Sequence, residues 1–491
     1  MKIFSIALNS HDHNTYDGLY HMQSERITRL KHNIPYHVDA YPEYSDVDKM
    51  NLNDGASIQK FYDEYYKDYN ETLLAFTLTK HGISYLNNHT IKNDFLKFKP
   101  KHLWDYILLE NKYYIDHHQS HATYAYLSSG YKESDILAID GNGSNFKCIF
   151  INKTGNIKDL SDKLSIGIMW NIISKDSGFG YLGAGKLMGL SAYGKVDEAI
   201  YLILETINKI KKEDIKKYEI KNIAATLQQL TIDSVLETIL PFKTSDNLCV
   251  SGGVAYNGYM NEEFTKYWTN VHVPPAVGDE GQALGSYMHA DFTQNQNIHV
   301  PKIYAGKEYD FNEGMPIDIS QVAQEIANGK IIGWFNGKSE SGNRALGNRS
   351  ILADPRNPNI KDIINKQIKR REDFRPFAPS VLEECYKEWF NTNQPSPYMS
   401  RIMTVKKDSI PGVTHIDNTA RIQTVNEKQN LKFYQLIKEF YKLTGIPMVL
   451  NTSFNCREPI VETPREAINT FNNTELDMVV INGRCLSKMG W

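Results

Sequence analysis

Two histidines four residues apart, His117 and His121, stand in the stretch IDHHQSHATYAY. If this stretch is helical, the spacing places both imidazoles on one face, while His118 points elsewhere. Two imidazoles on one face can bind a single metal ion. Because Gln119 and Ser120 stand between them, the glutamate of an H-E-x-x-H zinc protease is missing, and that class of enzyme is disfavoured.

Two carboxylates are available to complete this metal site. Asp140 ends the short apolar run DILAID (135–140), and Asp279 lies in PPAVGDEGQALG, a segment framed by proline and glycine. Two histidines and two aspartates offer imidazole nitrogen and hard oxygen ligands. Such a set suits Fe(II), Mn(II) or Zn(II) without deciding among them.

Glycines follow two of the apolar runs. GNG comes directly after Asp140, and NLCVSGGVAYNGYMNEE (247–263) is typical of a strand, a glycine turn and a helix. A glycine loop lets backbone N–H groups come close to a phosphate. The glycines that we predict to face a nucleotide are Gly141, Gly143, Gly252 and Gly253.

The second half of the chain is rich in cations beside glycine, proline and small hydroxyl residues. They stand in SESGNRALGNRSILADPR, IKRREDFRPFAP and NTARIQTV and are Arg344, Arg349, Lys369, Arg375 and Arg421. Arginine forks bind phosphates and carboxylates bidentately, and lysine neutralises them. The stretch FRPFAP surrounds its arginine with apolar residues, and a partly buried arginine needs an anion. In NTSFN, Asn451 and Ser453 could hydrogen-bond an adenine or a phosphate.

Two nucleotide-binding patterns in the middle of the chain are rejected. GFGYLG (178–183) matches G-x-G-x-x-G, but the preceding NIISKDS is a poor buried strand. GYLGAGKL (180–187) nearly matches a P-loop, but Leu187 replaces the hydroxyl residue that would bind magnesium.

The elements that must position these residues are short strands and amphipathic helices. KIFSIAL (2–8) and DILAID are apolar runs typical of buried strands, and GKIIGWF (329–335) begins a new strand-rich unit. The stretch 211–240 has apolar residues at helical spacing and is predicted to form a core-packed helix pair. From about Gln294 to Ser320 the chain is polar and contains proline and glycine, which predicts a linker.

Composition limits the class of protein. The 491 residues exceed what one core usually holds, so two domains are expected. Because 55 basic and 58 acidic residues nearly cancel, the overall charge does not indicate binding to nucleic acid or membrane. Five cysteines without C-x-x-C spacing favour a reducing cytoplasm, and we expect no signal peptide and no membrane span.

Taken in order, the motifs resemble the O-carbamoyltransferases of antibiotic and nodulation-factor biosynthesis. The resemblance covers almost the whole chain. In the first half it rests on HDHNTYDG, SERITRLKHN, HHQSHATYAY, IDGNGS, GKLMGLSAYG, SGGVAYNGYMN and GDEGQALG. In the second half it rests on NRALGNRSILADPR, IKRREDFRPFAP, NTARIQTV and LNTSFNCREPIVETPREA.

This resemblance implies an α/β protein of two domains. Residues 1–298 would form an actin-like, ribonuclease-H-like duplicated domain that transfers the carbamoyl group. Residues 299–319 would be the linker, and residues 320–491 an α/β domain similar to threonylcarbamoyl-AMP synthase. The second domain would make carbamoyl-adenylate from ATP and carbamoyl phosphate, and the first would pass the carbamoyl group to a hydroxyl.

The resemblance also implies roles for single residues. His117, His121, Asp140 and Asp279 would bind the metal, iron in the best-known relatives. Arg344, Lys369, Arg375, Arg421, Ser453 and Asn451 would hold ATP, with its Mg²⁺, and carbamoyl phosphate. His11, Lys31 and Asn257 would line the transfer site, with His11 either a general base or a positioning group.

The acceptor and some alternatives stay open. The acceptor would be a small molecule with a hydroxyl, such as a natural-product sugar, or a hydroxymethylated pyrimidine in a viral nucleotide or DNA. Other interpretations are a non-catalytic adenine-nucleotide-binding protein and, less favoured, a tRNA threonylcarbamoylation enzyme. A monomer or a homodimer is expected.

Overall fold

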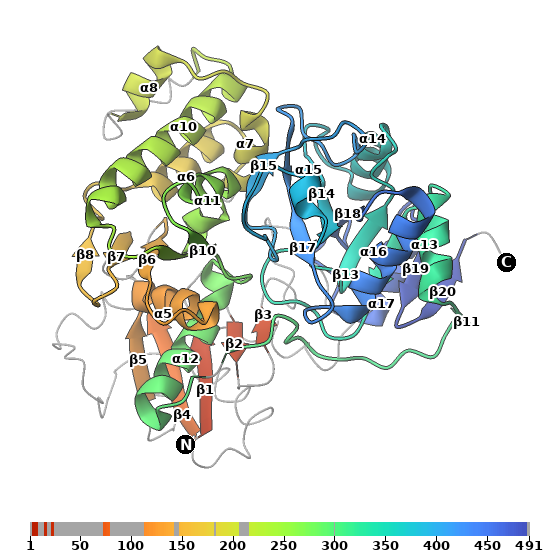
Figure 1. Cartoon of the computed structure of the whole chain (residues 1–491), viewed down its shortest axis with the longest axis horizontal. Helices are drawn as coiled ribbons and strands as arrows, with labels where there is room; N and C mark the ends of the chain where they lie inside the picture. Colours follow the sequence, from red (N-terminus) through yellow and green to blue (C-terminus); the bar gives the residue numbers. More distant parts are fainter. Residues whose placement is uncertain are drawn as a thin grey trace.

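A computed structural model gives the fold of the chain (Figure 1). The residues that it describes are 2–7, 14–16, 21–23, 72–78, 112–141, 147–180, 183–205, 216–298 and 300–488. His11, Lys31 and Gly143 lie outside these ranges, so their predicted roles stay predictions. The described part is mixed α/β, which confirms the predicted fold class at that level.

The first sheet has five strands in the order β3-β2-β1-β4-β5. Strands β1, β4 and β5 run parallel, whereas β2 and β3 are antiparallel additions at one edge. The strand predicted at residues 2–8 is β1. The bounds are β1 Lys2–Ala7, β2 Asn14–Tyr16, β3 His21–Gln23, β4 Thr72–Leu78 and β5 Lys112–Asp116.

The second sheet repeats this topology. Its order, β8-β7-β6-β9-β10, is again third, second, first, fourth and fifth strand of its unit. The parallel trio is β6, β9 and β10, and β7 and β8 are antiparallel. The bounds are β6 Asp135–Ile139, β7 Cys148–Ile151, β8 Ile157–Asp159, β9 Asn247–Ser251 and β10 Asn270–His272. The first half is therefore a duplicated α/β fold, as the resemblance implied.

Two helices lie between the sheets (Figure 1). Helix α12 (Gln282–Asn295) packs on β1 and β4, and helix α5 (His117–Ser129) packs on β6 and β9 and against α12. The two helices approach closely at Gly285, where a Cβ atom would lie 2.1 Å from the carbonyl oxygen of Ser120. The carboxylate of Asp116 caps α5 by accepting from the amides of His118 and Gln119. The start of α5, which carries the two histidines, is thus fixed in the interior.

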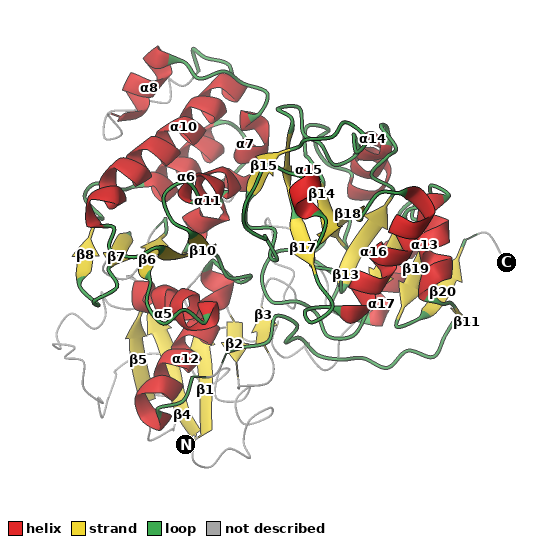
Figure 2. Ribbon diagram, viewed as in Figure 1, coloured by secondary structure: helices red, strands yellow, loops and turns green. Residues whose placement is uncertain are grey.

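Further helices cover the second sheet (Figure 2). Their bounds are α6 Ile166–Asp176, α7 Ala184–Ser191, α8 Glu198–Glu205, α10 Ile220–Ile239 and α11 Gly258–Phe264. The helix pair predicted at 211–240 is wrong in the described residues. Those from 220 to 239 form one helix, because no glycine or proline interrupts them, and Pro241 then forms part of the 3-10 turn η4 (Leu240–Phe242).

The second half contains an eight-stranded mixed sheet in the order β11-β20-β19-β12-β13-β18-β14-β17. The strand predicted within 329–335 is β12. The bounds are β11 Met315–Pro316, β12 Ile332–Phe335, β13 Arg349–Ala353, β14 Ala378–Leu382, β17 Gln423–Val425, β18 Met448–Ser453, β19 Met478–Ile481 and β20 Arg484–Ser487. A separate pair is formed by β15 Ile402–Thr404 and β16 Thr419–Arg421.

Helices pack on this large sheet and close its core. Helices α13 and α16 contact each other, α16 packs on β14 and β18, and α17 packs on β12 and β19. The bounds are α13 Ile319–Ala327, α14 Ile360–Ile363, the π-helical turn η7 Ile364–Lys369, α15 Tyr386–Trp389, α16 Leu431–Thr444 and α17 Pro464–Asn472. This core draws on residues from 317 to 485, and the core around the second sheet draws on residues from 137 to 277.

The segment between the two halves has little regular structure. Helix α12 ends at Asn295, and β11 is the next strand or helix. Tyr304 pairs with Glu340 in an isolated β-bridge, so this segment contacts the second half. The domain limits 299 and 319 stay a prediction. Within the described ranges, no helix combines the length and apolarity needed to cross a bilayer.

Candidate active site

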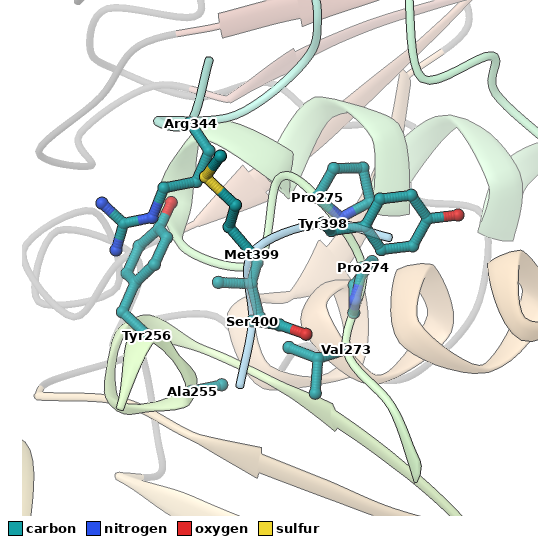
Figure 3. A pocket seen from close by; sticks show the side chains of 10 residues that line it. Ala255, Tyr256, Val273, Pro274, Pro275, Arg344, Tyr398, Met399 and Ser400 are labelled. Atoms are coloured by element: carbon teal, nitrogen blue, oxygen red, sulfur yellow. The ribbon is translucent and has the colours of Figure 1, made fainter. Parts of the chain in front are cut away.

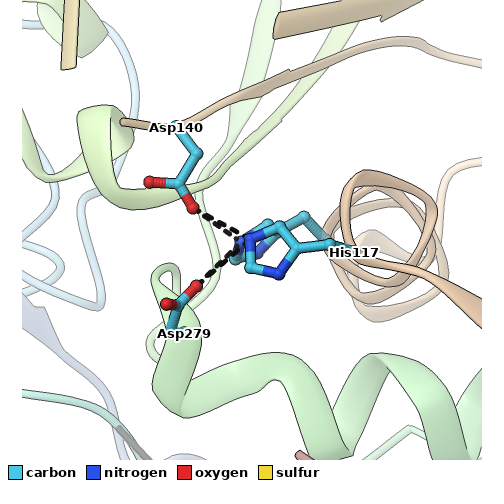
Figure 4. Close-up of side chains that lie close together, drawn as sticks. His117, Asp140 and Asp279 are labelled. Carbon is cyan, nitrogen blue, oxygen red and sulfur yellow. Dashed lines mark hydrogen bonds and ion pairs between the residues drawn. The ribbon is translucent and has the colours of Figure 1, made fainter. Parts of the chain in front are cut away.

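His117, His121, Asp140 and Asp279 converge on one point, although they come from three separate segments. Figure 4 shows Asp140 and Asp279 approaching His117 from two sides. The Nε2 atom of His117 lies 3.1 Å from Oδ2 of Asp140 and 3.3 Å from Oδ1 of Asp279. For Nε2 of His121 the same two distances are 3.3 and 3.4 Å. Both imidazoles are buried, and all four donor atoms lie within 4.8 Å of one another.

This arrangement fits a divalent metal ion. Ligand atoms about 2.1 Å from an ion lie about 3.0 Å apart at an octahedral right angle and about 3.4 Å apart at a tetrahedral angle. The four nitrogen-to-oxygen distances, 3.1 to 3.4 Å, fall in this range. All four contacts use Nε2 atoms, and each Nε2 carries at most one hydrogen, so hydrogen bonds alone would leave two protons to serve four contacts. The predicted set is thus brought together with a geometry suited to an ion.

The electrostatics of the set favour charge at its centre. Burial lowers the pKa of His121, but its hydrogen bonds and charge interactions with Asp140 and Asp279 outweigh burial and raise that pKa to about 9. Burial would raise the pKa of Asp140, yet the two histidines hold it well below its ordinary value. The Asp140 carboxylate therefore stays ionised and draws positive charge, which a metal cation supplies as well as a proton does.

His118, which follows the first ligand, differs from its neighbours. Its ring is buried, and this burial together with the charge of His117 lowers its pKa to about 4. A neutral His118 adds no positive charge beside the set. The sequence predicted that His118 points away from the other two histidines, and His118 is not among the four residues whose donor atoms converge.

The glycine pair Gly252 and Gly253 packs against the Asp140 segment. Gly252 has φ of +93°, and a Cβ atom there would lie 2.2 Å from the carbonyl oxygen of Ile139. A Cβ atom on Gly253 would lie 2.8 Å from Oδ1 of Asp140. The same Oδ1 accepts from the amide of Gly141 at 2.6 Å. Gly141, Gly252 and Gly253 therefore pack against or bind the segment that carries the Asp140 carboxylate. That these glycines approach a phosphate stays a prediction.

We predict that Gly253→Ala lowers the metal content of the purified protein by at least about tenfold. The added methyl group would push the Asp140 carboxylate away from the histidines, and a ligand set that loses its geometry loses affinity by about 10- to 100-fold. Metal analysis after dialysis measures this. Gly185→Ala in helix α7 is the matched control, since a Cβ atom there meets nothing within 4 Å. Full metal content in Gly253→Ala would show that the close contact does not position Asp140.

In the second half, buried polar groups fix the loop that carries Arg344. The carboxylate of Glu340, fully buried, accepts from the amides of Leu346 and Arg349. From the core, the side-chain Nδ2 of Asn451 donates to the carbonyl oxygen of Ala345 at 3.1 Å. The side-chain Nε2 of Gln423 donates to the carbonyl oxygen of Leu346 at 2.9 Å. Asn451 therefore holds the loop. Its predicted contact with adenine or phosphate stays a prediction.

Four arginines lie close enough to influence one another: Arg344, Arg371, Arg375 and Arg421. Burial and then the charges of the other three lower the pKa of Arg421 well below its ordinary value. Burial and Arg375 lower the pKa of Arg371 to about 9. Glu372 offsets part of this charge, with an oxygen 3.6 Å from Nη1 of Arg375.

The four arginines, the arginine cluster below, form a candidate site for a polyanion. Half-buried like charges repel one another, and a bound phosphate chain would relieve that repulsion. Among the described residues, Nε of Arg421 is buried without a hydrogen-bond acceptor, so this guanidinium is not fully used by the fold. The predictions included Arg344, Arg375 and Arg421. Arg371 was missed, although it stands in the same motif, four residues before Arg375.

Lys369 and Ser453 also come together, as predicted. Lys369 is the last residue of the π-helical turn η7, and its side chain is almost fully buried. It donates to the carbonyl oxygen of Ser453, to the hydroxyl of Ser453 at 3.0 Å and to Oδ1 of Asn455 at 2.6 Å. These acceptors are uncharged oxygens, so they position the ammonium group without neutralising its charge. It is therefore suited to a phosphate or carboxylate beside Ser453.

Arg349 was also grouped with the anion-binding cations, and its described contacts lie in the core, so a role in anion binding stays a prediction. Its side chain is fully buried, with the guanidinium carbon 3.5 Å from the centroid of the Phe335 ring. Its nitrogens donate to the carbonyl oxygens of Asn348, Asn336 and Glu462. These contacts place the guanidinium of Arg349 in the core of the second half, between an aromatic ring and three backbone carbonyl groups.

The metal group and the arginine cluster are linked through Tyr256, on the 3-10 turn η5 (Gly253–Tyr256). The guanidinium carbon of Arg344 lies 5.2 Å from the centroid of the Tyr256 ring, and the two side chains lie side by side in Figure 3. The hydroxyl of Tyr256 donates to Glu280, the neighbour of Asp279. Arg344 and Tyr256 also line a small pocket with Pro275, between the two halves.

Other contacts join the two halves around these residues. Lys186 on helix α7 forms an ion pair of 2.9 Å with Glu372. The hydroxyl of Tyr259 donates to Asp417 at 2.6 Å. Lys186 belongs to the P-loop-like stretch, and the residues before it, including Asn171–Asp176, are helical in α6. Since no strand precedes the glycines, the rejection of both nucleotide patterns is confirmed.

Asn257, predicted to line the transfer site, begins helix α11. Its Oδ1 accepts from the amide of Met260 at 3.1 Å and from Nε2 of Gln228 at 3.0 Å, and its Nδ2 donates to Oε1 of Gln228 at 3.0 Å. Both ends of the side chain are thus bound within the first half. They cap the helix that follows Tyr256, and a role in transfer stays a prediction.

Comparison with known proteins gives matches along both halves. A model described as carbamoyltransferase N-terminus matches residues 15–221 and 203–288, and one described as carbamoyltransferase C-terminus matches residues 323–488. Nodulation protein NolO of Bradyrhizobium diazoefficiens is 31% identical over 75% of this chain and 78% of its own. A 3'-hydroxymethylcephem-O-carbamoyltransferase of Streptomyces clavuligerus is 30% identical over 55% and 58%.

Solved structures give weaker similarity. Component A of the (R)-2-hydroxyglutaryl-CoA dehydratase of Acidaminococcus fermentans covers 59% of this chain with 97% of its own, at 13% identity and a TM-score of 0.37. A score of this size does not establish a shared fold. The duplicated topology of the first half rests on its own strand orders.

Proposed function

The chain belongs to the carbamoyltransferase family and is an enzyme of that type, and from this premise we propose that it is an ATP-dependent O-carbamoyltransferase with two reaction sites. One observation carries the proposal. A cluster of half-buried arginines suited to a polyphosphate is linked to the two-histidine, two-aspartate group through Tyr256, which contacts both Arg344 and Glu280, the neighbour of Asp279. One site would activate the carbamoyl group, and the other would transfer it.

In the first step, the arginine cluster and Lys369 would bind ATP, with its Mg²⁺, and carbamoyl phosphate. Water cleaves carbamoyl phosphate to carbamate and phosphate. A carbamate oxygen then attacks the α-phosphorus of ATP, the bond to the β-phosphate oxygen breaks, and pyrophosphate leaves with its electron pair. The product is carbamoyl-adenylate. The cationic side chains would neutralise the charge that develops on the leaving pyrophosphate, which is how such sites lower a barrier.

In the second step, an acceptor hydroxyl oxygen attacks the carbamoyl carbon. The bond from that carbon to the AMP oxygen breaks, AMP leaves, and the hydroxyl proton passes to a base. A metal ion held by His117, His121, Asp140 and Asp279 would supply Lewis-acid polarisation of the carbamoyl group. We propose Fe²⁺ as the ion, although the ligand set also suits Mn²⁺ and Zn²⁺. Buried walls around the two histidines would exclude water that competes with the acceptor.

The fold assignments that go with this proposal are an actin-like first domain and a second domain similar to threonylcarbamoyl-AMP synthase. The repeated strand order supports the first. The mixed sheet that presents Ser453 beside Lys369 is compatible with the second. We propose a small molecule with a free hydroxyl as the acceptor. The hydroxymethylated pyrimidine is the other acceptor to test.

The expected result of the direct test is pyrophosphate release that requires both ATP and carbamoyl phosphate. The metal-loaded protein would be assayed with each substrate alone and with both, while mass spectrometry looks for one added carbamoyl group on candidate hydroxyl compounds. Release with ATP alone would indicate another nucleotide reaction. Binding of ATP without pyrophosphate release under any combination would overturn the proposed activation step.

A further inference from the structure

The turn η5 lies against the Asp140 carboxylate at its first residue and bonds to Glu280, the neighbour of Asp279, at its last residue. At its first residue, Gly253, the backbone leaves room only for a hydrogen beside Oδ1 of Asp140, because a Cβ atom would come within 2.8 Å. At its last residue, the hydroxyl of Tyr256 donates to Oε1 of Glu280. Glu280 directly follows Asp279 and is 2% exposed, so the bond from Tyr256 reaches a buried carboxylate beside a predicted metal ligand.

The Glu280 carboxylate is also tied to its own backbone. Its Oε1 accepts from the amide of Gly278 at 3.0 Å, and a Cβ atom on Gly278 would lie 2.8 Å from Oε2 and 3.0 Å from the Tyr256 ring. The segment 278–280 and the ring of Tyr256 are therefore closely packed. A shift of Asp279 has to be accommodated at Tyr256.

On its other side, the Tyr256 ring supports Arg344. The guanidinium lies over the ring at 5.2 Å, within the range of a cation–π contact. Gly342, two residues before Arg344, packs on Pro275 so tightly that a Cβ atom would lie 2.2 Å from that carbonyl oxygen. The loop backbone is thus seated on the first half, and the ring determines where the guanidinium points.

We propose that Tyr256 is a positioning residue that couples metal loading to the binding of the nucleotide phosphates. This inference rests on the proposed function, because it requires the arginine cluster to bind ATP. A metal ion fixes Asp140 and Asp279, and these two fix η5 at both of its ends. The fixed Tyr256 ring then holds Arg344 in the orientation that meets a phosphate.

Coupling of this kind must be reciprocal. If metal raises the affinity for ATP by some factor, ATP raises the affinity for metal by the same factor, and typical factors are about 5 to 150. The contacts at Tyr256 orient one of several cations, so we expect a factor near the lower end, about 5 to 20. This factor changes binding, whereas the chemical step at saturating ATP is little affected.

The test compares metal-free and metal-loaded protein by calorimetric binding of a non-hydrolysable ATP analogue. In the wild type we expect the dissociation constant to fall about 5- to 20-fold on metal loading. The ratio to be compared is the dissociation constant of the metal-free protein divided by that of the metal-loaded protein. In Tyr256→Phe, which keeps the ring but loses the bond to Glu280, we expect this ratio to approach one. Metal titrations with and without the analogue should give the same two ratios.

Tyr201→Phe is the matched control. Tyr201 also donates its hydroxyl to a carboxylate, Oδ2 of Asp233 at 3.1 Å, but on helices α8 and α10, and the wild-type ratio should persist. If Tyr256→Phe does not fold, Arg344→Gln gives a second measurement, since it keeps the Tyr256–Glu280 bond and should also lose the ratio. A wild-type ratio of one, or a full ratio in Tyr256→Phe, would overturn the inference. Either result leaves pyrophosphate release intact, whereas failure of the proposed function abolishes it.

Discussion

Arg375→Ala is expected to reduce pyrophosphate release from ATP and carbamoyl phosphate by about 100-fold or more. A charge-assisted hydrogen bond contributes about 1.5–3 kcal/mol to binding. Loss of one group that stabilises transition-state charge costs about 100- to 1000-fold in rate. Arg375 is three-quarters buried beside Arg344 and Arg421, so water cannot replace it easily. Initial rates over a range of ATP concentrations would measure the loss.

The same substitution should leave the thermal stability of the ligand-free protein unchanged or slightly raised. Burial and Arg344 both lower the pKa of Arg375, which means that its charge is unfavourable where it stands, and Glu372 offsets this only in part. Removing the charge relieves repulsion within the arginine cluster. Loss of activity without loss of stability distinguishes a binding role from a structural one.

Arg465→Ala serves as the control for the loss of one arginine. This residue is exposed on helix α17, and its removal should leave pyrophosphate release within about twofold, as expected of surface substitutions. The assignment of the arginine cluster to phosphate binding fails if Arg375→Ala retains near wild-type release. It also fails if the activity of Arg375→Ala is lost only because the protein unfolds.

The metal group could be predicted from the sequence because its signals are local. The spacing of His117 and His121 acts through helix geometry alone, and Asp140 ends an apolar run that is a strand. That Asp279 joins them depends on packing of α12 against α5, which no local pattern contains. From the sequence, Asp279 could be offered only as an available carboxylate in a segment framed by proline and glycine, and the family resemblance then implied the same role.

The cation set was harder to predict because a motif does not give the direction of a side chain. Arg344 and Arg349 stand in one glycine-rich motif, yet the first faces Tyr256 and the second lies in the core over Phe335. In the next motif, Arg371 was passed over in favour of Arg375, although both join the cluster. Strand register and loop packing decide such directions, and both depend on residues far away in the sequence.

The duplication of the first half illustrates the same limit. The two sheets share one strand order, but the strands that correspond have no obvious sequence similarity, as KIFSIA and DILAI show. Any apolar run of this length can form a buried strand. The repeated order is thus visible in the pairing of strands, and from the sequence it could only be inferred through the family resemblance.

The interface between the halves determines how the two reaction sites can influence each other. The arginine cluster belongs to the second half, but two residues of the first half contact it or its surroundings. Lys186 forms an ion pair with Glu372, the partner of Arg375, and the ring of Tyr256 supports Arg344. Without the first half, the second half would therefore lack groups that orient its own cations. The two sites are separable by chemistry, yet each is completed by residues from the other half.

The double substitution of His117 and His121 by alanine tests that separation. We expect the variant to lose its metal, because two carboxylates alone form a weak and incomplete set. Carbamoyl transfer to the acceptor should fall below detection. Metal analysis and acceptor mass spectrometry measure these two losses, and a control such as Ser129→Ala, at the far end of helix α5, should show neither.

Pyrophosphate release in the histidine variant should persist at saturating ATP, because the cations of the second half remain in place. The apparent KM for ATP should rise by about the 5- to 20-fold factor expected for metal-free wild type, since the metal no longer fixes Tyr256. ATP would then be consumed without carbamoylated product, as carbamoyl-adenylate leaves and hydrolyses. If the folded variant loses pyrophosphate release entirely, the metal group and the arginine cluster form one centre, and the two-site mechanism is wrong. If metal and transfer both survive, the histidine pair is structural, and Asp140 and Asp279 bind the ion with other partners.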